Sequence, residues 1–175
     1  MKEQKKQIVV VSQILTIIGF SLCIGSIASF IAMNVITPKT TLDLDFTHWQ
    51  RYFAKPITNY VTVPGIWLFV TGNIGLYLFQ FNKDNLNTAI LIVAMLTFIN
   101  GIFVIVPTAR IVNRLAFEQA ELARNVPLFL RKKMFEDSCG GINLFLLITY
   151  LTLTVIQIRK KLPTANKALS VKSAD

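Results

Sequence analysis

Residues 88–106 read TAILIVAMLTFINGIFVIV and contain no charged side chain. The hydrocarbon core of a bilayer is about 30 Å thick, so a helix that crosses it needs roughly 17–25 mostly apolar residues. This stretch meets that requirement, and further apolar stretches of sufficient length lie at 8–36, 60–81 and 142–158. The sequence therefore predicts an all-α polytopic membrane protein, a bundle of four transmembrane helices with amphipathic segments at the membrane interface.

The composition is that of a chain solvated by lipid. Hydrophobic residues make up 53% of the sequence and charged residues only 15%, a balance that disfavours a water-soluble domain. The formal net charge of +9 comes from basic residues at the chain ends and between the apolar stretches. There they suit anionic lipid headgroups rather than nucleic acid. We expect one transmembrane domain, residues 1–158, and a polar C-terminal tail, residues 159–175, that is disordered or loosely bound to headgroups.

The first residues bear on processing and orientation. Lys2, Lys5 and Lys6 precede an apolar stretch, as in a secretory signal peptide, but the apolar part of a signal peptide runs only about 7–15 residues. The stretch 8–36 is longer, so we expect an uncleaved first helix. Four spans place both termini on one side of the membrane. The basic residues divide equally between the two sides, and the lysines before the first helix favour cytoplasmic termini.

Two prolines predict where the middle helices change direction. Pro64 is expected to kink the second helix, and Pro107 is expected to stop or bend the third. Beyond Pro107, residues 110–118 keep a helical periodicity with charges spaced about one turn apart. This pattern indicates an amphipathic extension that leaves the membrane or lies along its surface.

The connections between the spans carry two further signals. The polar segment after the first helix is expected to hold a short interfacial helix around Phe46–Phe53, with Trp49 and Tyr52 at headgroup level. The fourth helix is expected to begin after the glycine pair Gly140 and Gly141.

Small residues recur on the helices at spacings that let two backbones approach closely, which is how membrane helices associate without a hydrophobic driving force. We interpret them as packing faces within the bundle, and contact between copies in a homo-oligomer is the alternative. The candidate packing residues are Ser21, Gly25, Ser29, Gly72, Gly75 and Gly101.

Three asparagines, Asn73, Asn100 and Asn143, fall inside or near the ends of the second, third and fourth helices. Amides in lipid seek hydrogen-bond partners, so an interhelical polar cluster is the first interpretation. A polar substrate path is the alternative. Intramembrane pathways usually also carry ionisable groups, and none of the four hydrophobic centres contains one.

No set of residues predicts catalysis. His48 is the only histidine, and a metal site there would need further ligands from Asp43, Asp45 or a partner protein. Haem held by two histidines of one chain is excluded by that count. The sequence lacks a nucleophile elbow, a P-loop, a dinucleotide fingerprint and a paired metal motif. We therefore expect a non-enzyme without cofactors, with His48 as the remaining metal candidate.

Three passages share a pattern with a known family. They are Thr16–Gly25, with two glycines; Val63–Gly72, with a proline and a threonine-glycine pair; and Val106-Pro107, leading into Arg110 and Arg114. Together they resemble a family of uncharacterised bacterial four-helix integral membrane proteins, related in pattern to the membrane domain of copper resistance D-type proteins. The resemblance implies a four-helix fold in a bacterial inner membrane. Thr16 stands where the family pattern has histidine, so no haem or metal ligand is carried over at that position.

Three functional hypotheses follow. The first is a non-enzymatic accessory or interaction component of the inner membrane, in contact with lipid and with a protein partner or a second copy. The second is a small transporter or channel-like oligomer with an intramembrane polar path, which a water-filled cavity reaching Asn73 and Asn100 would favour and a packed, dry centre would remove. The third is a metal- or haem-associated membrane protein that uses His48.

Overall fold

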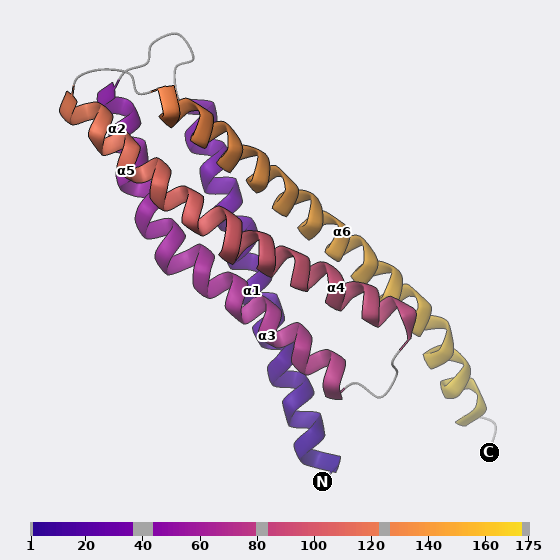
Figure 1. The fold of residues 1–175 in the computed structure, drawn as a ribbon. Coiled ribbons are helices and arrows are strands. Elements are labelled where there is room, and N and C mark those ends of the chain that lie inside the picture. The colour runs from indigo at the N-terminus through magenta and orange to yellow at the C-terminus, as the bar shows by residue number, and fades with distance from the viewer. Residues whose placement is uncertain (1, 37–43, 80–83, 123–126, 173–175) are drawn as a thin grey trace.

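The computed structural model describes residues 2–36, 44–79, 84–122 and 127–172. Within these ranges every residue except Asp84 is helical, and the helices form an antiparallel bundle with both termini at the same end (Figure 1). We call the opposite end, where the chain enters α2 and leaves α5, the α2–α5 end. The elements in chain order are α1 (Lys2–Ile36), α2 (Leu44–Ile57), η1 (Thr58–Thr62), α3 (Val63–Phe79), α4 (Asn85–Ile99), η2 (Asn100–Ile105), α5 (Val106–Leu122) and α6 (Pro127–Lys172).

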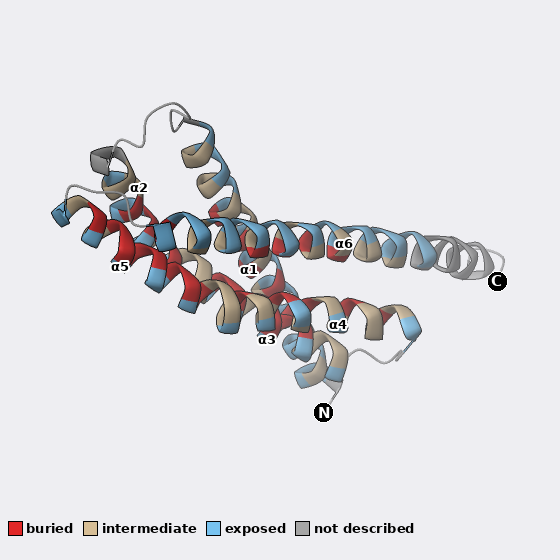
Figure 2. Ribbon diagram, turned by 45° about the horizontal axis from the view of Figure 1, so that its top comes forward, coloured by how far each residue is buried: buried red, intermediate tan, exposed pale blue. Residues whose placement is uncertain are grey.

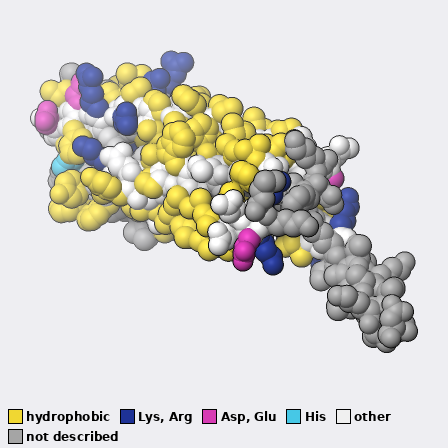
Figure 3. All heavy atoms as spheres, turned by 90° about the horizontal axis from the view of Figure 1, so that it is seen from below, with side chains coloured by type: hydrophobic (Ala, Val, Ile, Leu, Met, Phe, Trp, Pro, Cys, Tyr) yellow, Lys and Arg dark blue, Asp and Glu magenta, His cyan; other side chains and the backbone are white. Residues whose placement is uncertain are grey.

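Four long helices result, because α2 continues through η1 into α3 and α4 continues through η2 into α5. Each of the four is long and apolar enough to cross a membrane. Large apolar side chains such as Ile17, Phe103 and Phe145 are 65%, 67% and 69% exposed. In Figure 3 hydrophobic side chains cover the middle of the visible face, and charged side chains gather at its ends. A bilayer requires this distribution, and the predicted all-α, four-helix membrane fold is confirmed.

π-helical turns precede two of the prolines. The N–H of Val63 donates to the carbonyl of Thr58 at the end of η1, and the N–H of Val106 donates to that of Gly101 at the end of η2. Pro64 and Pro107 follow directly. A proline ring clashes with the carbonyl four residues back and provides no N–H, and a wider π turn is one way for a helix to accommodate this. The third helix therefore continues past Pro107 and does not stop there.

Several predicted boundaries are wrong. α6 runs without a break through Gly140 and Gly141, so the fourth helix does not begin after them. It also continues to Lys172, so most of the predicted tail is helical. Phe46–Phe53 is helical, but as part of a helix continuous with α3. Extending an existing helix costs far less free energy than starting a new one. The polar residues that flank an apolar span therefore continue its helix. The predicted end of the second span, residue 81, lies outside the described residues.

Alanine at both Gly140 and Gly141 is expected to raise the free energy of unfolding. A Cβ at either position would meet no atom within 4 Å, and glycine inside a helix costs about 0.5–1 kcal/mol relative to alanine. The double variant should therefore be about 1–2 kcal/mol more stable in thermal unfolding followed by circular dichroism. A loss of stability would show that the helix breaks at the pair.

α1 crosses α3 with the two backbones almost in contact. A Cβ on Gly19 would lie 2.7 Å from the carbonyl oxygen of Gly65 and 2.7 Å from the Cα of Phe69. A Cβ on Gly72 would lie 2.6 Å from the backbone nitrogen of Thr16. These distances leave no room for a larger side chain, so glycine is what permits the close approach that membrane helices use for association.

The packing face of α1 differs from the predicted one. Ser21 and Gly25 are exposed, Ser29 is half-buried, and no atom lies within 4 Å of a Cβ placed on Gly25. The predicted stripe therefore points away from the described neighbours of α1. The sequence offers two stripes of small residues on this helix, and the position of α3 selects the other. The buried stripe consists of Ser12, Thr16, Gly19, Cys23 and Ser26.

The small residues predicted on the other helices do lie at helix contacts. A Cβ on Gly72 or Gly75 would collide with residues of α1, and one on Gly101 would collide with the side chain of Ile66 on α3. The two predicted glycines of α3 thus face α1, and that of η2 faces α3.

The main core is built around buried residues of α1, α3, α4 and α6, among them Cys23, Phe69 and Leu147. A second, smaller core lies at the α2–α5 end. Val112, Leu115 and Ala116 of α5 and Phe129 of α6 are at most 8% exposed, and buried residues follow α5 in Figure 2. The predicted extension after Pro107 is thus a packed helix that continues directly from the third apolar span. Because α5 contacts both α2 and α6, this core holds those two elements in place for the site described next.

Candidate functional site

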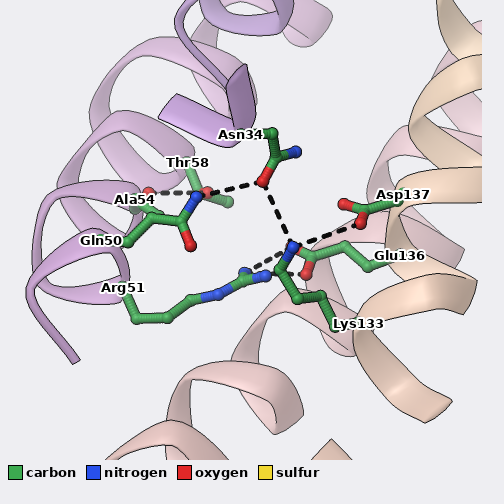
Figure 4. A network of polar contacts seen from close by, with 8 residues as sticks. All are labelled: Asn34, Gln50, Arg51, Ala54, Thr58, Lys133, Glu136 and Asp137. Atoms are coloured by element: carbon green, nitrogen blue, oxygen red, sulfur yellow. Dashed lines mark hydrogen bonds and ion pairs between the residues drawn. The ribbon is translucent and has the colours of Figure 1, made fainter. Parts of the chain in front are cut away.

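Polar side chains from α1, α2 and α6 meet near the α2–α5 end, and Figure 4 shows their contacts from close by. We call this group the polar cluster. Nη1 of Arg51 lies 3.0 Å from Oε1 and 2.7 Å from Oε2 of Glu136, and it donates a hydrogen bond to Oε1. Arg51 is only 5% exposed, and a buried charge is costly unless it is paired. Glu136 provides that pairing. The members of the cluster are Asn34, Gln50, Arg51, Lys133, Glu136 and Asp137.

One amide oxygen connects the cluster to α1. Nε2 of Gln50 donates to Oδ1 of Asn34 at 3.0 Å, and Nζ of Lys133 donates to the same oxygen at 3.3 Å. Lys133 also lies 3.5 Å from Oδ2 of Asp137. The oxygen of Asn34 therefore joins three helices, and the cluster as a whole contains as many cations as carboxylates.

A cavity of about 210 Å³, the side cavity, adjoins the polar cluster. A smaller cavity of about 60 Å³ continues toward the bundle centre and reaches Ser26, Thr97 and Asn143. The side cavity is polar at one end and apolar toward the bundle centre. Its polar lining includes Asn34, Gln50, Arg51, Glu136 and Asp137, and its apolar lining includes Ile27, Phe30, Ile105 and Leu144.

The side cavity opens between α1 and α6. Gly140 and Gly141 line it, and a Cβ on either would meet no atom within 4 Å. Ile31 lines the cavity from α1 and is 49% exposed. Toward the bundle centre the two helices close together, with the ring centroids of Phe20 and Tyr150 5.8 Å apart. The opening therefore lies beside the apolar band, where a bilayer would supply lipid.

The structure brings two of the three candidate asparagines together. Nδ2 of Asn100 donates to Oδ1 of Asn143 at 2.8 Å and to the carbonyl of Cys139 at 2.9 Å. This contact joins η2 to α6. It is an interhelical polar contact between two of the three asparagines for which the sequence predicted one cluster.

Asn73 lies apart from that pair. Its Oδ1 accepts from the hydroxyl of Tyr150 at 3.0 Å, and its Nδ2 donates to the carbonyl of Phe69 at 2.8 Å. It lines a cavity of about 70 Å³ that also contacts Asn87 and Gln157, toward the end with the termini. No cavity described above is lined by both Asn73 and Asn143. The apolar side chains that pack at the centre are Ile66, Phe69 and Leu147, each at most 2% exposed.

Leucine at Asn143 is expected to destabilise the protein by about 0.6–1.7 kcal/mol, the average and the largest values measured for hydrogen bonds between membrane helices. The amide of Asn100 would keep one acceptor and lose the other. Thermal unfolding of the single variants and of the double variant Asn100→Leu/Asn143→Leu gives their coupling energy. Strictly additive losses would show that the two amides do not interact.

His48 contacts an aromatic ring. It packs edge-on against Phe117 of α5, with ring centroids 4.6 Å apart. Among the described residues, no group of three or more His, Cys, Asp and Glu side chains could hold a metal ion. Of the two further ligands considered, Asp43 lies outside the described residues and the side chain of Asp45 is not described.

The sequence did not single out the polar cluster. Arg51 and Glu136 are 85 residues apart. In the sequence, Glu136 follows a run of basic residues, any of which could be its ion-pair partner. The one available signal is position, since Arg51 and Glu136 each lie a short distance outside an apolar stretch. Position at the membrane boundary does not identify which charges meet.

The fold and the site together define the class: an integral membrane protein whose four-helix bundle contains an amphipathic cavity between α1 and α6. No protein-family model matches the chain, and neither a curated protein nor a solved structure matches it. The family resemblance drawn from Thr16–Gly25, Val63–Gly72 and Val106–Arg114 stays a prediction.

Proposed function

We propose that the protein is a non-catalytic component of the membrane that binds an amphiphile from the bilayer in the side cavity. The observation that supports this most directly is the distribution of its lining: charged and amide groups at one end, apolar side chains at the other, and an opening between α1 and α6. A lipid has a polar head and apolar chains in the same order, and binding sites combine apolar walls with a few placed polar groups. The role is that of an accessory or interaction component.

Leucine at Gly140 tests the proposal, because this glycine lines both the side cavity and its 60 Å³ extension. Its Cβ has free space, so the added side chain fills the cavity and the fold is retained. Native mass spectrometry of the full chain from a gentle detergent should show bound lipid on the wild type. The variant should retain it at least about tenfold less, the factor that 1.4 kcal/mol of lost contact produces.

Gly25→Leu is the matched control. Gly25 also lies in open space but does not line the side cavity, so this variant should retain lipid like the wild type. Equal retention by the Gly140→Leu variant and the wild type would contradict the proposal.

For the location we propose a bacterial inner membrane with both termini in the cytoplasm, which puts the side cavity at the opposite face. The lysines at the start of the first helix support this orientation. Single cysteines at Glu121 and Lys160, in a background with Cys23 and Cys139 replaced by serine, distinguish the two faces. An impermeant thiol reagent on intact cells should label the first position and spare the second.

A small transporter with an intramembrane polar path is the alternative, and the packing of the bundle centre counts against it. Ile66, Phe69 and Leu147 are each at most 2% exposed there. The cavity that reaches Asn143 and the cavity that reaches Asn73 share no lining residue. We therefore expect solute flux into proteoliposomes to be the same with and without the protein, and a flux that depends on the protein would restore the transporter hypothesis.

A further inference from the structure

A cavity of about 330 Å³ lies between α5 and the helix formed by α2 and η1, and we call it the basic pocket. Lys55 lines it from α2, and Arg110 and Arg114 line it from α5. All three residues are exposed, so their charged ends are accessible to a ligand. The basic pocket shares only Thr58 with the lining of the side cavity, and it is therefore a second site.

The cations of the basic pocket have no opposite charge beside them. Its lining contains no carboxylate. In the part of the chain that the structure describes, the side chains of Lys55, Arg110 and Arg114 form neither an ion pair nor a hydrogen bond. Glu118 follows Arg114 by one helical turn and still does not pair with it. Three like charges around one cavity repel one another and attract an anion.

A neutral donor lies among these cations. Asn113 lines the basic pocket and is only 8% exposed, and its spacing from Arg110 and Arg114 puts the three on one face of α5. The side chain of Asn113 forms no hydrogen bond with any described residue, and its Oδ1 is enclosed. Nδ2 is therefore the atom of this amide that can face the cavity. A buried amide rarely lacks a partner in a native protein, and an anion in the pocket provides an acceptor for Nδ2.

The position of the basic pocket along the helices is that of lipid headgroups. Lys55 stands shortly before the apolar stretch 60–81, and Arg110 stands shortly after the apolar stretch 88–106. Two aromatic side chains of α2, Trp49 and Tyr52, are each 59% exposed, and such side chains gather where a membrane meets water. The anion most abundant at this level is the phosphate of a lipid.

We infer that the basic pocket binds the phosphate group of an anionic phospholipid. The phosphate oxygens accept from the guanidinium groups of Arg110 and Arg114, which suit phosphate through their paired N–H donors, and from Nδ2 of Asn113. Lys55 provides the third positive charge. A zwitterionic head also carries a phosphate, but its ammonium would add a fourth positive charge to the pocket. The inference goes beyond the proposed function, because the basic pocket and the side cavity are different sites.

The test compares two lipids with identical acyl chains. Full-length protein, delipidated in detergent at low ionic strength, is mixed with equal amounts of phosphatidylglycerol and phosphatidylethanolamine, and the bound lipids are counted by native mass spectrometry. The measurement is repeated with Gly140→Leu, which fills the side cavity and leaves the basic pocket open. In both proteins phosphatidylglycerol should be retained over phosphatidylethanolamine by roughly tenfold, which corresponds to 1.4 kcal/mol.

The double variant Arg110→Gln/Arg114→Gln locates the preference. Both arginines are exposed and unpaired among the described residues, so the fold is retained. This variant should retain phosphatidylglycerol at least about tenfold less than the wild type, the factor that one lost hydrogen bond to a charged group produces. The matched control is Arg131→Gln/Lys132→Gln. It removes two charges at the same end of the bundle from residues that line none of the cavities described above, and it should bind like the wild type.

Inorganic phosphate distinguishes a lipid from a free phosphate ion, which offers the same oxygens. Phosphatidylglycerol that stays bound in millimolar phosphate supports the lipid as the ligand. Displacement by millimolar phosphate assigns the pocket to the free ion and overturns the lipid assignment. Equal retention of the two lipids, or an equal loss in the two double variants, overturns the site itself. A failure of Gly140→Leu to lower total lipid retention contradicts only the proposed function, because the preference at the basic pocket does not require the side cavity.

Discussion

Replacing Arg51 with methionine is expected to lower the free energy of unfolding by about 3–5 kcal/mol, the usual cost of removing one partner of a buried ion pair. The side chains of Arg51 and Glu136 are 6% and 13% exposed. Without the guanidinium, the carboxylate of Glu136 stays buried without its hydrogen-bonded partner, and Lys133 is the cation of the polar cluster that remains near it. A loss of this size removes a large share of the 5–15 kcal/mol that typically stabilises a folded protein.

The double variant Arg51→Met/Glu136→Leu separates the pairing from the packing. With both charges gone no unpaired ion remains, and such replacements of buried pairs are often neutral or stabilising. We therefore expect the double variant to recover most or all of the stability lost by the single one. Unfolding in mixed detergent, followed by circular dichroism, measures the free energies of unfolding of the wild type, the single variant and the double variant.

Asp137→Asn is the control for charge removal by itself. Its pair with Lys133 is long and partly exposed, and exposed pairs contribute about 0–1 kcal/mol. If Arg51→Met were no more damaging than Asp137→Asn, the Arg51–Glu136 pair would be solvated and the site would lose its structural basis.

Leucine at Gly19 is expected to separate α1 from α3 and to cost about 3 kcal/mol or more, at the upper end for overpacked cores. The added Cβ alone would collide with the backbone of Phe69 and lie 2.7 Å from the carbonyl oxygen of Gly65. Backbone atoms cannot rotate away as a side-chain end can. The two helices must move apart, which forfeits contacts along the whole buried stripe of α1.

Thiol alkylation reports this separation directly. Cys23 follows Gly19 by one helical turn, is 3% exposed and belongs to the main core. In the Gly19→Leu variant Cys23 should react with a membrane-permeant maleimide much faster than in the wild type, as read by mass spectrometry of its peptide. Gly25→Leu, with nothing within 4 Å, should stay within about 0.5 kcal/mol of the wild type and leave Cys23 protected. Fast alkylation in both variants would show that α1 is loosely held everywhere.

These two contacts hold in place α1 and α6, which both line the side cavity. The glycines fix α1 against α3, and the Arg51–Glu136 pair fixes α2 against α6. Between them, α1 and α6 are joined at the polar end through Asn34 and Lys133 at 3.3 Å. The width of the opening therefore depends on both contacts, so a substitution at either should also weaken lipid retention.

The sequence predicted the spans well and their limits poorly. A stretch without charge such as 88–106 can be recognised because each residue adds its own transfer free energy to the total. The start of α6 was misplaced because Gly140 and Gly141 weaken a helix locally, while packing of Phe129 against α5 holds the preceding segment in helical form. Packing of that kind overrides local propensity.

In the site, too, the sequence indicated which residues need a partner but not which partner each one finds. Asn100 and Asn143 were candidates for contact, and they meet at 2.8 Å. Asn73 looked equivalent in sequence, yet it bonds to Tyr150 instead. The depth of a residue along its helix follows roughly from its position in the span. The direction it faces depends on how the helices are rotated about their axes.

The sequence by itself determined that this chain has four segments long and apolar enough to cross a membrane, because partition between lipid and water is a sum over residues that needs no neighbour in space. Only the tertiary structure decided which stripe of α1 packs, which charges pair and where a cavity remains. Each of those depends on residues far apart in the chain, as Arg51 and Glu136 are, and on distances of a few ångströms that hydropathy does not encode.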